Sequence, residues 1–332
     1  MQRIVYIDYL KAFAIFLVIL GHTIQQTAAH DALFSRLFAI IYSFHMPLFM
    51  AISGYFLQRV LDKGMRSFLI HRSRQLLLPV LSFATVVFAC RALGWFDVTE
   101  GKTFWGYLGG GDMWFLKTLF ACTLIALVSR LLFRRTLIAA LLPSTVLMLV
   151  SRVGLAKLLP YLWLGYALHR YHHHLERHAR TIAIVCGVVL AIALPHWQLE
   201  YDFPYYKAIS LSHGFHLSLP HLGIILFRTL VGTAGCLLCF ALFSLLSHTG
   251  TSTVARFFHR AGTRTLGMYC LQIYLLEDLL HYLHFMPQNR MVLLVAVPVI
   301  AVAEWLLCDG IALLMERNRV TALLFLGQWR KK

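Results

Sequence analysis

Three ionisable side chains, Asp8, Lys11 and His22, interrupt the first hydrophobic stretch of the chain, which runs from Asp8 to Thr23 and reads DYLKAFAIFLVILGHT. A lysine or aspartate at the centre of a membrane helix costs about 2.5–3.5 kcal/mol on insertion scales, so such residues usually have a function. At about 100° per residue, the step from Lys11 to His22 leaves a remainder of roughly 20° and an axial separation of about 16 Å. Both side chains therefore share one face of the predicted helix, which should face a bundle interior or a wet cavity.

The histidine of this pair favours proton transfer, because neutral imidazole accepts a proton near pH 7. A second histidine, His45, lies in the next hydrophobic stretch, two positions before a proline that should kink the helix. Consecutive helices joined by a short loop are usually neighbours, so His22 and His45 can meet at similar depth. We therefore take His22, His45 and Lys11 as candidate catalytic residues, acting through a general base or a proton relay.

Lys11 also has a simpler explanation. Asp8 precedes it by three residues, so the two side chains can pair on one helix face. Such a pair could serve only to let the lysine snorkel to the nearby membrane surface. The sequence leaves both interpretations open.

Polar residues also occur in later hydrophobic stretches. Arg228 lies about a third of the way into residues 219–246 and needs a partner, for which Glu304 is the best candidate by depth. Together with Gln272, these two residues are candidate substrate-binding residues. Other charged residues lie near the ends of their stretches, where an interfacial position explains them: Arg91, Glu277 and Asp278.

The composition indicates a polytopic membrane protein. The chain has 332 residues, of which 59% are hydrophobic and only 13% are charged, and it contains many separate apolar runs of spanning length. We expect an all-α transmembrane helical bundle of about ten helices, forming one membrane domain over residues 1–332. The fifth and sixth spans are short and could be one broken hairpin. The expected spans are residues 8–23, 37–57, 76–90, 113–129, 136–150, 155–168, 181–195, 219–246, 265–283 and 292–315.

The sequence gives no support for a disulfide framework, a metal site or a cleavable signal peptide. The seven cysteines all fall within apolar runs, as small core residues do, so we expect no disulfide framework. The run His172–His174 could bind a metal, but a basic juxtamembrane loop explains it better, and we predict no metal. The first stretch is too long for a cleavable signal peptide and lacks a small-residue cleavage site.

The distribution of Lys and Arg predicts the orientation. With the N-terminus in the cytoplasm, twenty Lys and Arg residues fall in cytoplasmic segments, including five in the 59–74 loop, and six fall outside. This asymmetry supports an N-in, C-in topology with an even number of spans. It also explains the net charge of +16 without a nucleic-acid partner.

Five motifs in a fixed order carry a resemblance to a known family. They read YIDYLKAFAIFLVILGHT, FHMPLFMAISGYFL, the basic run that ends at Arg74 before LLLP, MWFL at residues 113–116, and GTRTLGMYCLQ at residues 262–272. In these motifs the chain resembles the membrane-bound acyltransferase family 3, which O-acylates cell-surface glycans. The first motif is most similar to members grouped with fucose 4-O-acetylases.

The resemblance implies ten core helices, a cytoplasmic acyl-CoA donor and an acceptor on the outside. The family's catalytic histidine, in its Lys-x10-His motif, corresponds to His22, with Lys11 as its companion. Many relatives end the ninth-helix motif in histidine where this chain has Gln272, which implies a hydrogen-bonding rather than a catalytic role here. Trp114, in MWFL, is a further candidate substrate contact.

The family's Arg-x-x-Arg element for the donor corresponds to residues 71–74, where His71 replaces the first arginine and Arg72 could substitute for it. A basic segment suits the phosphates of CoA, so Arg72, Arg74 and Lys11 are candidate donor contacts, with acetyl-CoA as the favoured donor. The slender pantetheine arm could pass Lys11 and bring its thioester to His22. Whether the histidine acts as base or carries the acyl group stays open.

We therefore expect a membrane-bound O-acyltransferase, most simply an acetyltransferase, in a bacterial cytoplasmic membrane. It would move an acyl group from cytoplasmic acyl-CoA to a hydroxyl of an extracytoplasmic or lipid-linked glycan. The competing hypothesis is a multi-pass transporter or flippase for a glycan or lipid-linked sugar, which would also have buried charges and a polar cavity. The ordered motifs favour the enzyme.

Overall fold

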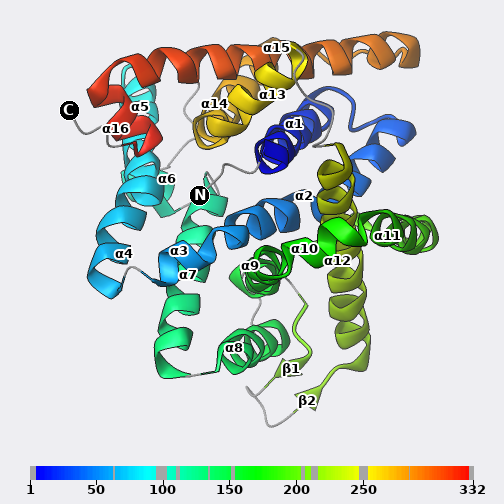
Figure 1. The fold of residues 1–332 in the computed structure, drawn as a ribbon. Helices are drawn as coiled ribbons and strands as arrows, with labels where there is room; N and C mark the ends of the chain where they lie inside the picture. Colours follow the sequence, from blue (N-terminus) through cyan, green and yellow to red (C-terminus); the bar gives the residue numbers. More distant parts are fainter. Residues whose placement is uncertain are drawn as a thin grey trace. The chain divides into compact units, whose positions relative to one another are not determined.

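The computed structural model of the chain describes residues 5–62, 64–94, 103–109, 113–133, 135–150, 154–202, 206–210, 216–246, 253–283 and 285–328. This part of the chain is almost wholly helical, which confirms the predicted all-α class (Figure 1). Its two strands, β1 (Ile209–Ser210) and β2 (His216–Leu217), form one short antiparallel pair.

Each of the ten expected spans is matched by a helix. Among the described residues, seven helices are long and apolar enough to cross a membrane, and α8 is apolar but has only 15 residues. The fifth and sixth spans form two helices, α8 and α9, which pack against each other, so two short spans and one broken hairpin both stay predictions. The ten are α1 (Val5–Thr27), α2 (Ala32–Tyr55), α5 (Leu78–Ala92), α7 (Trp114–Leu132), α8 (Thr136–Val150), α9 (Gly154–Arg170), α11 (Ala179–Ala193), α12 (Leu219–Leu246), α14 (Thr265–Leu283) and α15 (Arg290–Arg317).

The basic segment before α5 is helical, not the loop that we expected. A π-helical turn, η1 (Ser73–Leu77), joins α4 (Met65–Arg72) directly to α5. Arg, Leu, Gln and Met are good helix formers, and Phe68 on α4 is fully buried, so propensity and packing both favour the helix. The remaining short helices are α3 (Leu57–Leu61), α6 (Phe104–Gly109), α10 (His172–Arg177), η2 (Leu194–His196), η3 (Leu199–Asp202), α13 (Thr253–Thr263) and α16 (Arg319–Leu326).

The chain forms two compact units, each assembled from segments that are far apart in sequence. The first unit contains residues 1–14, 36–64 and 121–262, and the second contains residues 15–35, 65–120 and 263–332. The boundary falls inside α1, so this helix contributes to both units. The expectation of a single membrane domain stays a prediction.

In the first unit, α2 and α9 meet backbone to backbone. A Cβ on Gly54 would lie 1.9 Å from the carbonyl oxygen of Leu162, and one on Gly165 would lie 1.8 Å from that of Ala51. Such contacts need glycine, as is common where membrane helices pack closely. Gly54 belongs to the motif FHMPLFMAISGYFL, so packing explains part of that motif.

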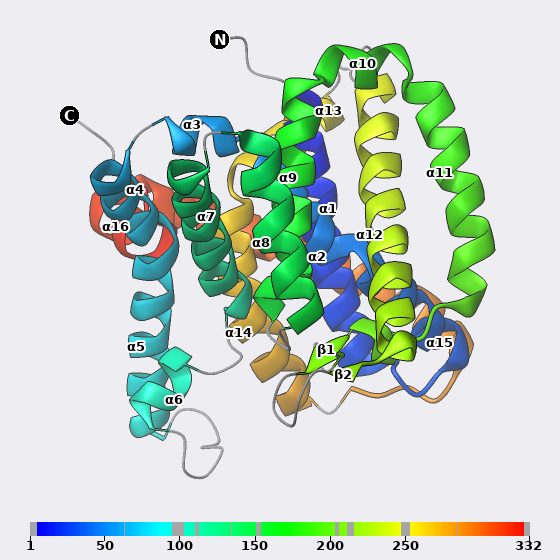
Figure 2. The ribbon, with the colours of Figure 1, turned by 90° about the horizontal axis from the view of Figure 1, so that it is seen from below.

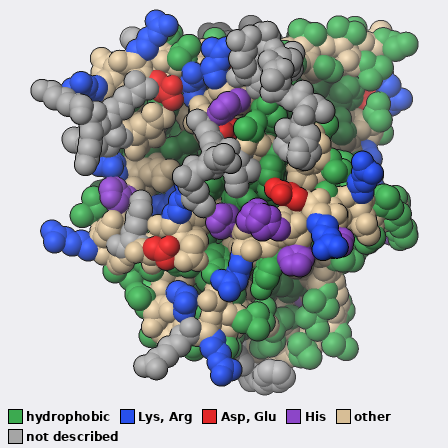
Figure 3. Space-filling view, in the orientation of Figure 1, with side chains coloured by type: hydrophobic (Ala, Val, Ile, Leu, Met, Phe, Trp, Pro, Cys, Tyr) green, Lys and Arg blue, Asp and Glu red, His purple; other side chains and the backbone are tan. Residues whose placement is uncertain are grey.

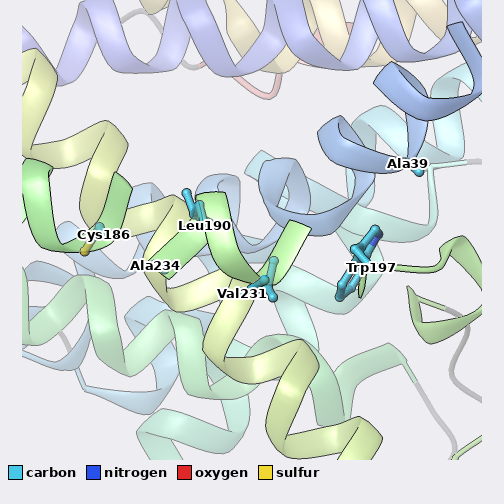
Figure 4. Packing of buried hydrophobic residues seen from close by; sticks show 7 residues of the cluster. Ala39, Cys186, Leu190, Trp197, Val231 and Ala234 are labelled. Carbon is cyan, nitrogen blue, oxygen red and sulfur yellow. The ribbon is translucent and has the colours of Figure 1, made fainter. Parts of the chain in front are cut away.

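Two long helices of the first unit, α11 and α12, run side by side, with α10 at one of their ends and the β1–β2 pair at the other (Figure 2). An apolar cluster lies between them (Figure 4). In it, Cys186 and Leu190 of α11 pack with Val231 and Ala234 of α12, and Trp197 closes the cluster just beyond α11. The cluster fixes the end of α11 against α12.

In the second unit, α15 packs against α14 and α16, and α16 packs against α5 (Figure 1). Arg264, immediately before α14, fastens this arrangement. Its guanidinium lies 2.9 Å from Asp309 Oδ1 and 3.0 Å from Glu316 Oε2, both on α15. The side chain of Gln328 also donates to Glu316, at 3.1 Å, so one carboxylate holds both α14 and the residues after α16.

Candidate active site

The first turns of α1 hold Lys11 by contacts on two sides. Its ammonium lies 3.3 Å from Asp8 Oδ1, which confirms the expected pair. On the other side it lies 4.8 Å from the centre of the Phe56 ring, and Arg59 approaches the same ring at 5.5 Å. The cation is thus positioned by an anion and an aromatic face, with 23% of its side chain exposed. Both interpretations of Lys11, a functional cation and a lysine that snorkels with Asp8 as its partner, stay predictions.

Asp8 has a second partner that the sequence did not suggest. Its Oδ2 lies 3.2 Å from Nδ1 of His259, on α13. The two helices come close because of Gly262, where a Cβ would lie only 2.0 Å from the Asp8 carbonyl oxygen. The motif beginning at Gly262 therefore meets the motif beginning at Tyr6, and Asp8 joins the two.

His22 lies on the same unbroken helix as Lys11, in the part of α1 that belongs to the second unit. Its side chain is partly buried and interacts with Gln25, one turn later. The hydroxyl of Thr23 donates to the Ile19 carbonyl at 2.9 Å, and that of Thr27 donates to the Thr23 carbonyl at 2.7 Å. The hydroxyls of this turn therefore bond to carbonyl oxygens of α1 itself. The catalytic role of His22 stays a prediction.

His45 is buried on α2, in the first unit, with 3% of its surface exposed. Its Nδ1 lies 2.9 Å from the Ile41 carbonyl, and its ring lies 4.5 Å from that of Tyr42. A carbonyl can only accept, so Nδ1 donates, and Nε2 is the acceptor nitrogen of the neutral ring. This is the tautomer that a base or relay requires. The meeting of His22 with His45 stays a prediction, because they belong to different units.

The candidate donor residues lie at the π-helical turn. Arg72 donates to Gln75 Oε1 at 2.9 Å, and an Arg74 nitrogen lies 3.4 Å from Nδ1 of His71. Gly327, in a left-handed conformation after α16, brings its backbone against this turn, where a Cβ would lie 2.7 Å from the Arg74 carbonyl oxygen. Single π turns inside helices frequently mark functional sites.

Two candidate substrate residues of the second unit are buried polar groups. Gln272 is fully buried on α14, and Glu304 on α15 is 8% exposed. Neither the amide of Gln272 nor the carboxylate of Glu304 has a hydrogen-bond partner among the residues that the structure describes. Trp114, at the start of α7, is 37% exposed and packs edge-on against Phe115 at 6.2 Å.

Arg228 is buried on α12 in the first unit, with 7% exposed. It interacts electrostatically with Tyr161 and Asp202, and its carbonyl accepts a hydrogen bond from the Tyr161 hydroxyl at 3.4 Å. The expected pairing with Glu304 stays a prediction, because Glu304 belongs to the second unit. The side chains of the expected interfacial residues Arg91, Glu277 and Asp278 lie outside the described residues.

A partly buried cation of the first unit has a partner that the sequence did not indicate. Lys157, in the first turn of α9, pairs with Asp202 at 2.9 Å and also donates to the Asp202 carbonyl. A lysine in an apolar run next to Leu158 and Leu159 was the available signal.

Histidines gather over α10 among Lys and Arg side chains (Figure 3). The rings of His172 and His173 lie 3.8 Å apart, and His169 stacks on His172 at 6.3 Å. In the described part of the chain no group of three or more His, Cys, Asp or Glu side chains could hold a metal ion.

Comparisons with known proteins identify a matching family and two relatives. A family model described as an acyltransferase domain matches residues 4–308. The nodulation protein NolL of Sinorhizobium fredii is 28% identical over 216 residues, which cover 59% of this chain and 58% of the relative. NolL of Mesorhizobium japonicum is 42% identical over 89 residues, covering 26% and 24%. The chain thus spans less than two thirds of these relatives, and no solved structure matches it significantly.

Proposed function

Since this chain belongs to the acyltransferase-3 family and is a membrane acyltransferase, we propose that it carries an acyl group from cytoplasmic acyl-CoA to a glycan hydroxyl. The acyl group is acetyl in the favoured case. The acceptor is an extracytoplasmic or lipid-linked glycan, and the membrane is a bacterial cytoplasmic membrane. The observation that carries the proposal is α1, one unbroken helix with a fixed cation near one end and an imidazole near the other.

The proposed reaction needs only groups that these residues provide. His22 takes the proton of the acceptor hydroxyl as its oxygen attacks the thioester carbonyl, and the CoA sulfur leaves with the electron pair of the broken C–S bond. The proton then passes from the imidazolium to the leaving thiolate. In the alternative course, His22 first takes the acyl group and then passes it to the hydroxyl. His45, whose Nδ1 is bonded to the Ile41 carbonyl, would relay or orient the proton.

The donor would enter from the side of the basic residues. Arg72 and Arg74 would bind the CoA phosphates, and Lys11 would fix the end of the pantetheine arm. Asp8 and Phe56 support this role for Lys11, because they fix the ammonium on two sides. The buried polar residues Gln272 and Glu304, with Arg228 and Trp114, are the proposed acceptor contacts.

The direction of transfer follows from the positive-inside rule, which places residues 60–72 and 170–180 in the cytoplasm. The first unit has charged side chains at both ends of its helices. Arg59 and Lys11 share the Phe56 ring near one end, whereas Lys157 and Asp202 pair at the far end of α9. We place the first end in the cytoplasm.

A liposome assay tests the proposal. Purified protein is reconstituted with acyl-CoA that carries a labelled acetyl group, and with candidate glycans in the opposite compartment. Covalent label on the glycan, lost in His22→Ala, is the expected result. If the glycan crosses the membrane without modification, the protein is a transporter and the proposed enzyme activity is wrong.

A further inference from the structure

A hollow of about 330 Å³ opens at the end of the first unit that carries the β1–β2 pair. Its six lining residues come from two segments, residues 194–202 (η2 to η3) and the first turns of α12: His196, Tyr201, Pro220, Gly223, Ile224 and Phe227. Its volume is at the lower end of the range for small-molecule sites. The proposed catalytic residues are not among those that line it.

The α12 wall is one helix stripe. Residues 220, 223, 224 and 227 follow the i, i+3, i+4, i+7 spacing of a single face. A Cβ on Gly223 would meet nothing within 4 Å, so the glycine is not required for packing and leaves the hollow open. The aromatic rings of Tyr201 and Phe227 stand perpendicular, 6.0 Å apart, and form two sides.

The opposite wall, residues 194–202, is held by two partly buried cations, Arg36 and Lys157. Arg36 donates to the carbonyl oxygens of Leu194 and Trp197, the latter at 2.8 Å. Trp197 is 1% exposed and packs under both Tyr201 and Phe227, at 5.9 and 6.2 Å. These contacts hold the first half of the wall.

The second half of the wall is held by Asp202, which immediately follows Tyr201. Its carboxylate and its carbonyl both accept from the partly buried ammonium of Lys157. Removing a charge from water is costly. Here the two cations Arg36 and Lys157 hold the backbone of residues 194–202. A rigid wall keeps its aromatic ring in place before a ligand arrives, which is what a binding site requires.

We infer that this hollow binds a pyranose ring of the acceptor glycan, with Tyr201 and Phe227 against its C–H face and the His196 imidazole bonded to a ring hydroxyl. The inference rests on the proposed function, which calls for a glycan on this side of the membrane. It assigns Gly223, Tyr201 and His196 to acceptor recognition. The pair Lys157–Asp202 is a positioning pair for Tyr201.

The composition of the hollow favours a sugar over a lipid chain. A pyranose presents an apolar C–H face and a rim of hydroxyls, and the hollow offers two aromatic faces and an exposed imidazole. A hydrocarbon chain would leave the imidazole and the Tyr201 hydroxyl without use. The hollow also lies beside polar side chains of the connecting segments, including Glu200 and Asp202, and not at the middle of a span.

Two leucine substitutions give a matched test. Gly223→Leu fills the hollow, whereas Gly187→Leu makes the same change on α11, where a Cβ also meets nothing within 4 Å. Binding of methyl glycosides of glucose, galactose, fucose and N-acetylglucosamine is measured by saturation-transfer NMR on protein in nanodiscs without donor. We expect a sugar signal in the wild type and in Gly187→Leu, and at least a tenfold weaker one in Gly223→Leu.

Further readouts separate this inference from the proposed function. Tyr201→Ala should weaken sugar binding, and Tyr201→Phe should retain it, because the ring face does the stacking. In the transfer assay, Gly223→Leu should raise the acceptor KM at least tenfold and leave the donor KM unchanged. If the two leucine variants transfer the acyl group with equal acceptor KM, the hollow is not the acceptor site. The proposed acyltransferase activity would still stand. Sugar binding in the absence of any transfer would contradict the proposed acyltransferase activity, whereas the sugar site in the hollow would still stand. The absence of any sugar signal in the wild type, or its displacement by alkyl chains alone, would overturn the inference.

Discussion

His22 is the side chain whose loss should separate binding from chemistry. Replacing it by Ala removes the imidazole from a face of α1 that Lys11 also occupies, and leaves the helix intact because Ala is the best helix former. We expect turnover to fall by about 10²–10⁴-fold, the usual contribution of a general base, and by more if His22 carries the acyl group. Donor affinity, measured by equilibrium binding of acyl-CoA, should change little.

A folded His22→Ala protein that retains more than about a tenth of wild-type turnover would contradict this role, since it falls short of the smallest expected loss. The chemistry would then move to His45, whose tautomer is already suited to a base. The same assay on His45→Ala gives the comparison.

Arg74 allows a test of the donor site. Arg74→Gln should raise the KM for acyl-CoA with a smaller change in kcat, because a phosphate contact acts on ground state and transition state alike. Arg66→Gln is the matched control, since Arg66 is an exposed arginine in the same basic segment. If both substitutions give the same donor KM as the wild type, these arginines serve only to orient the chain.

Asp31, between α1 and α2, gives a pH prediction. A hydrogen bond from Arg290 at 2.7 Å, assisted by the backbone N–H groups of Leu33 and Phe34, lowers the pKa of Asp31 below its ordinary value. A carboxylate with a lowered folded-state pKa stabilises the fold above its unfolded pKa of about 3.9, and this is lost as the pH falls through the folded value. The gain is small, because Arg290 is 58% exposed.

The measurement compares thermal unfolding of the wild type and Asp31→Asn in detergent between pH 7 and pH 3. The wild type should be slightly more stable at pH 7, and the difference should shrink only below about pH 4. A difference that persists undiminished at pH 3 would show that the charge of Asp31 is not its source.

Residues close in sequence were predictable from sequence, and residues brought together by the fold were not. The Asp8–Lys11 pair followed from an i, i+3 spacing on an apolar helix. His259 also contacts Asp8, but nothing local to either residue indicates it. The roles proposed for His22, Arg74 and the acceptor contacts stay predictions.

At the scale of elements, glycine at a helix crossing decides whether two motifs can meet. Gly262→Ala would place a Cβ 2.0 Å from a backbone oxygen of α1, which cannot rotate away as a side chain could. We expect a loss of about 1–3 kcal/mol in unfolding free energy, the usual cost of overpacking, and reduced activity because Asp8 shifts. Thermal unfolding and the transfer assay measure the two effects.

Gly187→Ala is the control for this substitution. Its Cβ meets open space, so the unfolding free energy of the variant should be about 0.5–1 kcal/mol higher than that of the wild type. This is the usual gain when alanine replaces glycine in a helix interior. Equal stability changes in the two variants would mean that the α1–α13 contact contributes nothing.

Helices were easier to predict than the turns between them. Apolar length is a local property, and each of the ten expected spans has its helix. The helical basic segment and its π turn were missed, because hydropathy reports burial in lipid and says nothing of a helix that continues outside it. What fixes that turn is the backbone of Gly327, far away in sequence.

At the scale of the whole molecule, the interleaving of the two units was not predictable. Hydropathy orders the spans along the chain, but which spans pack together depends on contacts such as Gly54 with Leu162 or Arg264 with Asp309. In a membrane, small residues and polar pairs determine such contacts, and single residues of this kind carry no periodic signal.

The orientation of the whole molecule can be measured by cysteine labelling. The twenty-to-six distribution of Lys and Arg predicts that residues 60–72 and 170–180 are cytoplasmic and that 97–112 and 198–218 are external. Suitable single positions are exposed in the structure: Ile70 and Tyr171 for the cytoplasmic side, Glu200 and His216 for the outside.

Six of the seven native cysteines are buried, so they are replaced by alanine to give a cysteine-free background with little change in surface. In intact cells, an impermeant maleimide should label Glu200→Cys and His216→Cys, and should label Ile70→Cys and Tyr171→Cys only after the membrane is opened. Each variant must retain transfer activity to count as correctly inserted. Labelling of Ile70→Cys from outside would place Arg72 and Arg74 on the wrong side for a cytoplasmic donor. It would overturn the topology and the donor site together, because both depend on the same basic segment.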